Sequence, residues 1–163
     1  MVMIGFSSFA KEQKKKQKTT TNPNQITSLS VYHSACHGRC PVYRFELNRS
    51  GLATYTGIAF IPDSGTYTKN LGSAFAKKML DMFGSFRLDT CKDRYENRVV
   101  DAPGLEVVVH YGSKTKTIDN AHYGPVIVRR VGIIMDSVLA QKLVENTLQP
   151  LGKSWHKTTG GHK

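Results

Sequence analysis

The stretch Val42–Gly57, VYRFELNRSGLATYTG, decides the fold. From Val42 to Asn48 apolar and polar side chains alternate, which is typical of a strand that buries one face. Asn48–Gly51 reads as a compact turn, and Leu52–Gly57 reads as the returning strand. We therefore predict an antiparallel hairpin here, and the other elements are placed around it.

Further strands are predicted on both sides of this hairpin. Ile26–His33 alternates ahead of it, and Gly65–Asn70 is a candidate short strand behind it. Leu105–Tyr111 and Lys114–Asp119 form a second hairpin around a Gly-Ser turn. Strands joined by turns this short pair antiparallel.

Two helices are predicted, one between the hairpins and one after them. Ser73 suits the N-cap of a helix that ends at Phe86. Its expected apolar face comprises Phe75, Met79, Met82, Phe83 and Phe86. Gly124-Pro125 opens the second helix, Val126–Leu148, which is apolar on most sides. Such a helix is buried in a core or lies at an interface.

The order of these elements predicts an α+β fold. We expect a two-layer sandwich with a mainly antiparallel sheet and both helices on one face, in the order βββα-ββα. This single domain is expected to span residues 26–148. Its length suits one hydrophobic core.

The two ends of the chain are unlike its middle. The net charge is +11, of which residues 1–25 supply five lysines against one acid, and residues 151–163 supply three lysines and no acid. Lys11–Gln25 is too poor in apolar residues to fold alone, so we predict a disordered linker there and a flexible basic tail over residues 149–163.

Met1–Ala10 is short and apolar and ends in Ser-Phe-Ala, small residues at the spacing that a signal peptidase reads. We expect an export signal that lacks its start, and therefore a periplasmic or cell-envelope location. An ordinary N-terminal tail on a cytoplasmic protein is the alternative. No run approaches the ~20 apolar residues of a membrane-spanning helix.

Cys36–Tyr43, CHGRCPVY, is the segment richest in chemistry. A turn at Gly38 would bring Cys36 and Cys40 within bonding distance, and we favour a structural disulfide between them, with Cys91 as the alternative partner. A metal site built from His33, Cys36, His37 and Cys40 is a weaker alternative, because no second compact ligand pair follows. Thiol redox catalysis is weaker still, because the usual dithiol catalyst has two residues between its cysteines.

The cysteine segment belongs to a longer pattern that resembles a known protein family. The pattern Cys36-x-Gly38-x-Cys40-Pro41-x-Tyr43, followed by Gly51-x-x-x-Tyr55-x-Gly57, resembles a family of uncharacterised bacterial domains, domain of unknown function 6438. The later Tyr95, Asp101-x-Pro103 and the step from Asp119 to Pro125 are also similar, so the resemblance spans Ile26–Lys142. It implies a small bacterial domain that often follows an export or lipoprotein signal. It implies no activity, so no catalytic residue is carried over.

We therefore expect a non-catalytic binding or structural module of the cell envelope, with no cofactor and with a protein or envelope component as its partner.

Two other kinds of site are less favoured. Arg87–Gly104 is a long charged connection, and its carboxylates would have to converge to do acid-base chemistry, whereas solvated side chains are commoner. These carboxylates are Asp89, Asp93, Glu96 and Asp101. Nucleic acid is a disfavoured partner, because lysine tails bind phosphate only weakly and the final helix offers only Arg129 and Arg130.

Overall fold

The structure is a computed structural model that describes residues 24–96, 101–144 and 155–158. Its elements in chain order are β1 (Ile26–His33), β2 (Val42–Asn48), β3 (Leu52–Ala59), β4 (Gly65–Asn70), α1 (Ser73–Gly84), η1 (Leu88–Thr90), β5 (Leu105–Tyr111), β6 (Lys114–Ile118), η2 (Ala121–Tyr123), α2 (Val126–Val144) and β7 (His156–Lys157).

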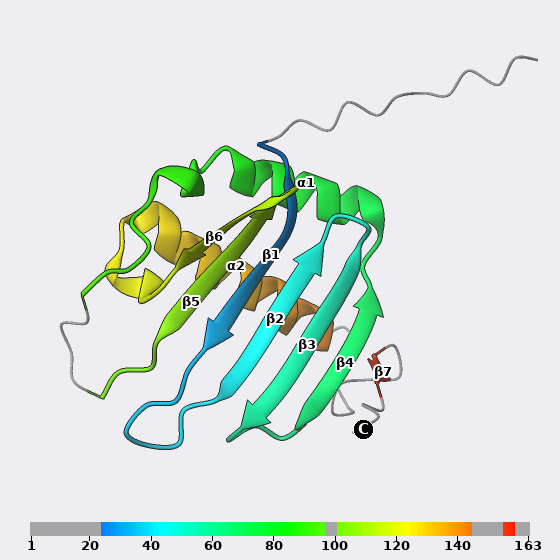
Figure 1. Cartoon of the computed structure of the whole chain (residues 1–163). Coiled ribbons are helices and arrows are strands. Elements are labelled where there is room, and N and C mark those ends of the chain that lie inside the picture. The colour runs from blue at the N-terminus through cyan, green and yellow to red at the C-terminus, as the bar shows by residue number, and fades with distance from the viewer. Residues whose placement is uncertain (1–23, 97–100, 145–154, 159–163) are drawn as a thin grey trace, which may run out of the picture.

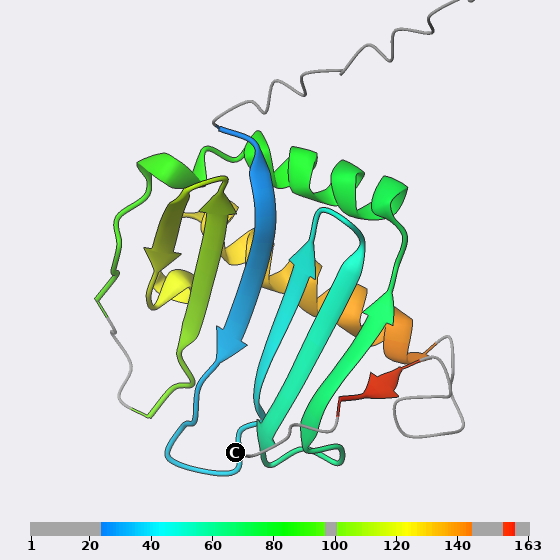
Figure 2. The ribbon, with the colours of Figure 1, turned by 45° about the vertical axis from the view of Figure 1, so that its right-hand side comes forward.

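The strands form one seven-stranded sheet in the order β6-β5-β1-β2-β3-β4-β7, and every neighbouring pair of these strands is antiparallel. Figures 1 and 2 show α1 and α2 on the same side of this sheet. The predicted α+β class, the antiparallel sheet and the two helices are therefore confirmed.

The core lies between the sheet and the helices because the strands alternate. Val31 of β1 pairs with Phe45 of β2 and with Val107 of β5, and all three side chains are fully buried. Two residues away, Leu29 repeats the pattern with Leu47 and Val109. These rows face the helices, as the period of two requires.

The opposite face of the sheet is mostly polar. Thr54 pairs with Thr68 and Thr56 with Thr66, while Arg44 donates a 3.0 Å hydrogen bond from Nη2 to Glu106. Neither helix covers this face in Figure 1. One sheet thus carries an apolar row and a polar row, which is how an antiparallel sheet is covered on one side only.

The predicted strand order was incomplete. Gly65–Asn70 is a full strand that pairs with β3 over six positions, so four strands precede α1 and not three. Its threonines and lysine leave no clear alternation of apolar and polar residues, since only Tyr67 supplies a large apolar side chain. A seventh strand, β7, pairs with β4 within the segment expected to be a tail, and the adjacent Trp155 is buried.

The predicted face and cap of α1 were also partly wrong. Ala76, Leu80 and Phe83 are the buried residues, whereas Phe75, Met79, Met82 and Phe86 pack at the margin of the core. The helix ends at Gly84, and its N-cap is Gly72, which gives no side-chain cap. The small Ala76 lies inside because α1 sits close to β1.

The second helix begins at Val126, directly after Pro125, as predicted, and is described to Val144; the rest of the predicted helix lies outside the described residues. The signal-like segment and almost all of the predicted linker lie outside them too. Within the described residues no helix is both long and apolar enough to cross a bilayer.

Candidate functional site

The site begins where β1 ends and β2 starts. His33 and Tyr43 are direct partners across these strands, one step beyond Val31 and Phe45 in the row that faces the helices. Their rings stack with centroids 4.6 Å apart. The same alternation that builds the core therefore turns two polar aromatic side chains towards α2.

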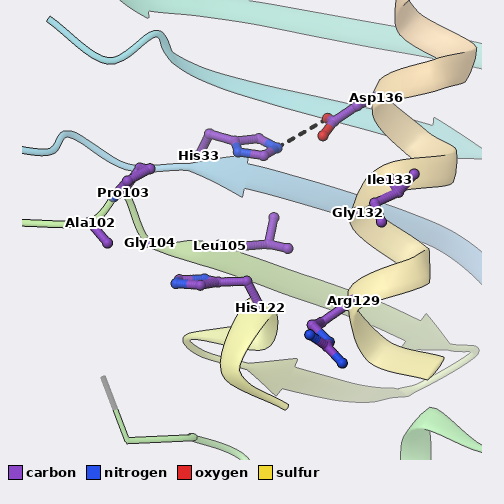
Figure 3. A pocket seen from close by; sticks show the side chains of 10 residues that line it. All are labelled: His33, Ala102, Pro103, Gly104, Leu105, His122, Arg129, Gly132, Ile133 and Asp136. Carbon is purple, nitrogen blue, oxygen red and sulfur yellow. Dashed lines mark hydrogen bonds and ion pairs between the residues drawn. The ribbon is translucent and has the colours of Figure 1, made fainter. Parts of the chain in front are cut away.

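Asp136 of α2 meets this pair. The Tyr43 hydroxyl donates a 2.8 Å hydrogen bond to Asp136 Oδ1, and His33 Nε2 lies 3.0 Å from the same oxygen (Figure 3). Burial, followed by the nearby Asp136 carboxylate, raises the pKa of Tyr43 well above its usual value. The phenol therefore stays neutral and keeps donating.

A cavity of about 360 Å³ opens beside this cluster, between α2 and the start of β5. Its lining residues are His33, Ala102, Pro103, Gly104, Leu105, His122, Arg129, Gly132, Ile133 and Asp136. The exposed lining is mostly carbon, so the cavity is apolar with a few polar groups at its ends. A Cβ on Gly132 would lie 2.7 Å from Leu105 Cδ2, so glycine lets α2 come close to the sheet at this wall.

His122 is the unusual member of the lining. Both ring nitrogens are buried, and neither has a hydrogen-bond partner among the described residues. Burial, followed by the proximity of His33, lowers the pKa of His122 below its usual value. A buried polar group without a partner is unfavourable by about 1–3 kcal/mol, so this imidazole has unused capacity for a hydrogen bond.

Tyr95 contacts the turn that carries His122. Asn120 has a left-handed backbone (φ 51°) at the start of η2, and its Nδ2 donates a 3.0 Å hydrogen bond to the Tyr95 carbonyl. The Tyr95 ring fills the space beside Gly124, where a Cβ would lie 2.8 Å from Tyr95 Cε2. Tyr95, expected as a motif position, thus supports the site without lining it.

The cysteine loop connects the end of β1 to the start of β2, next to the His33–Tyr43 pair. The Sγ atoms of Cys36 and Cys40 lie 1.93 Å apart, at disulfide-bonding distance, and the two Cα atoms are 5.7 Å apart. Cys91 is free. Ser34 ties this loop to the pocket, because its backbone N–H donates to the Gly104 carbonyl (3.0 Å) and its Oγ accepts from the Gly104 N–H (2.8 Å).

The remaining predicted positions lie around this loop. Gly38 is exposed on it, and Pro41 borders a second cavity of about 310 Å³ on the other side of Asp136. Pro103 lines the first cavity. Asp101 has a left-handed backbone (φ 74°) and lies 3.6 Å from His37, both side chains being exposed.

The predicted metal-ligand set does not converge in this structure. The sulfur atoms of Cys36 and Cys40 are joined to each other, His33 contacts Asp136, and His37 contacts Asp101. Among the described residues no group of three or more His, Cys, Asp or Glu side chains could hold a metal ion.

The carboxylates of the charged connection between α1 and β5 do not converge either. Its acids pair with separate bases, Asp89 with Arg87, Asp93 with Lys116 and Asp101 with His37. Glu96, the fourth, is exposed. These four carboxylates form no shared acid-base site.

Sequence reasoning missed Asp136 and undervalued His122. Asp136 is the one acidic residue in Val126–Val144, and a lone carboxylate in so apolar a helix was a usable signal. Ahead of the final helix, a polar loop is the commoner interpretation of His122, and nothing in the local sequence shows that its turn folds under α2.

One protein-family model matches this chain. The family model described as "Domain of unknown function (DUF6438)" matches residues 27–133, a range that holds His33, Tyr43 and His122 and ends three residues before Asp136. A search of curated proteins gave no match. Since the matched range covers well over half of the chain, this protein belongs to the DUF6438 domain family.

Proposed function

We propose that this domain is a non-catalytic binding module of the cell envelope, and that it holds a small, largely apolar ligand in the cavity between α2 and β5. The observation that carries the proposal is an apolar cavity whose wall holds an imidazole, His122, with no hydrogen-bond partner in the part of the chain that the structure describes. Small-molecule sites combine apolar walls with a few polar groups and commonly have volumes of about 300–1,000 Å³. The cavity, at about 360 Å³, lies within this range.

A rigid frame supports a binding role. Asp136 joins α2 to the ends of β1 and β2 through His33 and Tyr43, and Ser34 joins the cysteine loop to Gly104. These contacts hold α2 and the segment before β5 to the ends of β1 and β2 without a ligand. Preorganised walls reduce the entropy lost on binding.

The expected location rests on the cysteines. A disulfide persists in oxidising compartments such as the periplasm or the cell surface and is rare in the cytosol. The bonded Cys36–Cys40 pair thus favours export, together with the signal-like Met1–Ala10. Fractionation of cells that produce the protein from its complete gene tests this: most of it should leave the cytoplasm, and retention there would refute export.

The alternatives are less well supported by the site. Thiol redox chemistry would place the sulfur atoms beside the substrate, yet neither Cys36 nor Cys40 lines either cavity. Nucleic-acid binding would require a structured basic face, whereas the open face of the sheet pairs Arg44 with Glu106.

Binding is tested by NMR on the oxidised full chain with 3-phenylpropionamide, a neutral probe with an apolar ring. We expect saturable shifts of the amide signals of Gly104, Leu105 and Gly132. The variant Ala102→Trp, which narrows the mouth of the cavity, should abolish them. Ala74→Trp is the matched control, because Ala74 is exposed on α1 away from the cavity.

Two results would refute the binding proposal. One is the absence of saturable shifts at the cavity with this probe and with the charged probes described below. The other is shifts that are equal in Ala102→Trp and in Ala74→Trp.

A further inference from the structure

The polar groups of the cavity are divided between its two ends. Figure 3 shows His33 and Asp136 at one end, and His122 and Arg129 at the other, with Leu105 between them. The two ends differ in what they can offer to a ligand.

The end with Asp136 is already paired. Asp136 Oδ1 accepts from Tyr43 and contacts His33, so the carboxylate has two partners within 3.0 Å. A ligand amine placed there would have to compete with both. This end therefore serves to hold the walls together.

The end with His122 is unpaired and carries positive charge. His122 has no hydrogen-bond partner for either ring nitrogen among the described residues, and the exposed Arg129 lines the same end. A neutral imidazole offers one N–H donor, and a protonated imidazole offers two. Donors next to an arginine match an anionic acceptor, and guanidinium–carboxylate pairs are among the stronger hydrogen bonds in proteins.

Resting on the proposed function, we infer that the ligand is a small organic acid, whose apolar body fills the cavity and whose carboxylate is held by His122 and Arg129. The apolar body contacts Leu105, Pro103 and Ile133. The carboxylate gives His122 the partner that it lacks. No bond is made or broken.

This arrangement couples binding to a proton. A carboxylate beside His122 favours its protonated form, so the acid should bind more tightly as the pH falls from about 8 to about 6, where the acid itself stays ionised. The groups that line the cavity with His122 are His33 from β1 and Arg129 and Asp136 from α2. The Tyr123 ring, from the same turn as His122, lies tilted against it with 3.9 Å between ring centroids. Since His33 is a second histidine at this cavity, a variant must separate the two.

The experiment compares three probes with the same apolar body, 3-phenylpropionate, 3-phenylpropionamide and 3-phenylpropylamine, by NMR titration of the oxidised full chain. The acid should bind about tenfold more tightly than the amide, and the amine more weakly than either. If the amide or the amine binds at the cavity as tightly as the acid, the assigned head group is wrong, while the proposed binding function stands. If none of the three shifts the cavity signals, the binding function fails.

Variants identify the residues. Arg129→Gln should weaken acid binding by about threefold to tenfold, and should weaken amide binding less. Arg130→Gln is the matched control, because Arg130 is an exposed neighbour on α2 that does not line the cavity and its loss changes the net charge equally. Equal weakening by both variants would reduce the effect to general charge attraction and overturn the inference.

His122→Gln keeps a polar side chain of similar length but removes the titrating group. Acid affinity should then lose its dependence on pH between about 6 and 8, while the amide still binds. Unchanged pH dependence in this variant would refute the role of His122.

Discussion

Removal of the Cys36–Cys40 bond should destabilise the domain by an amount that the loop itself sets. The bond joins cysteines four positions apart, so it closes a loop of five residues. In the chain-entropy model, a loop of this size is worth about 2 kcal/mol at 25 °C. For a domain of this size, that loss corresponds to a decrease of about 5–10 °C in Tm.

The loss should be concentrated near the site. The loop follows His33 and leads into Tyr43, and Ser34 connects it to Gly104. Without the bond, these two strand ends lose a restraint. We therefore expect amide shifts in Cys36→Ser/Cys40→Ser to spread from the loop to Gly104 and Asp136, and to leave the hairpin turn at Gly51 unchanged.

Urea denaturation of the oxidised full chain, compared with the double variant, measures the effect. The m-value should stay constant, because the same surface is buried. Wild-type protein treated with reductant should match the double variant. Cys91→Ser is the control for loss of a thiol, since Cys91 takes part in no disulfide. A loss below about 0.5 kcal/mol, or above about 4 kcal/mol, would refute the loop-closure argument.

Three further predictions concern single residues. Tyr43→Phe removes the 2.8 Å hydrogen bond to Asp136 and should lower the free energy of unfolding by about 1.5 kcal/mol. Tyr55→Phe is the control and should lower it less, because no hydrogen bond of the Tyr55 hydroxyl is found among the described residues. Equal losses of unfolding free energy in urea denaturation would argue against the contact with Asp136. Burial raises the pKa of Tyr111 to about 12, so the unfolded chain releases this proton near pH 10 while the folded chain keeps it. The free energy of unfolding therefore falls as the pH rises from about 10 to about 12, and Tyr111→Phe should reduce this fall. An unchanged dependence of the unfolding free energy on pH would count against burial of the phenol. Gly51→Ala should lower the free energy of unfolding by about 2 kcal/mol or more, since φ is +99° and the new Cβ would lie 2.5 Å from the Gly72 carbonyl carbon. Gly84→Ala is the control, with open space around the new Cβ, and should be neutral or stabilising in thermal or urea unfolding. The reverse order of stabilities would contradict the contact between the turn and the start of α1.

The sheet could be predicted from sequence because its pattern is local. Phe45 and Leu47 alternate with Arg44 and Glu46, and this is sufficient to assign a strand and its buried face. The prediction weakened where the pattern was polar. β4 reads GTYTKN, and its place in the sheet depends on its pairing with β3 and not on its own hydrophobicity.

The candidate site could be predicted only in part, because its residues come from distant parts of the chain. His33 and Tyr43 follow from the alternation of β1 and β2, but Asp136 lies 103 positions from His33. Local periodicity reports which side of a helix is apolar, and it gives no information on which strand that side will meet. The buried turn of His122 depends in the same way on Tyr95 and Asn120, which lie 25 positions apart.

The pairing of β4 with β7 has a consequence for biosynthesis. Thr66 accepts hydrogen bonds from Thr158, which lies 92 positions later in the chain. A ribosome makes the chain from the N-terminus at about 5–20 residues per second, so β4 waits for several seconds with its outer edge uncovered. During that interval the nascent chain displays a strand edge that other chains can join, and Lys69 on β4 places a charge along this edge, a common safeguard against such association.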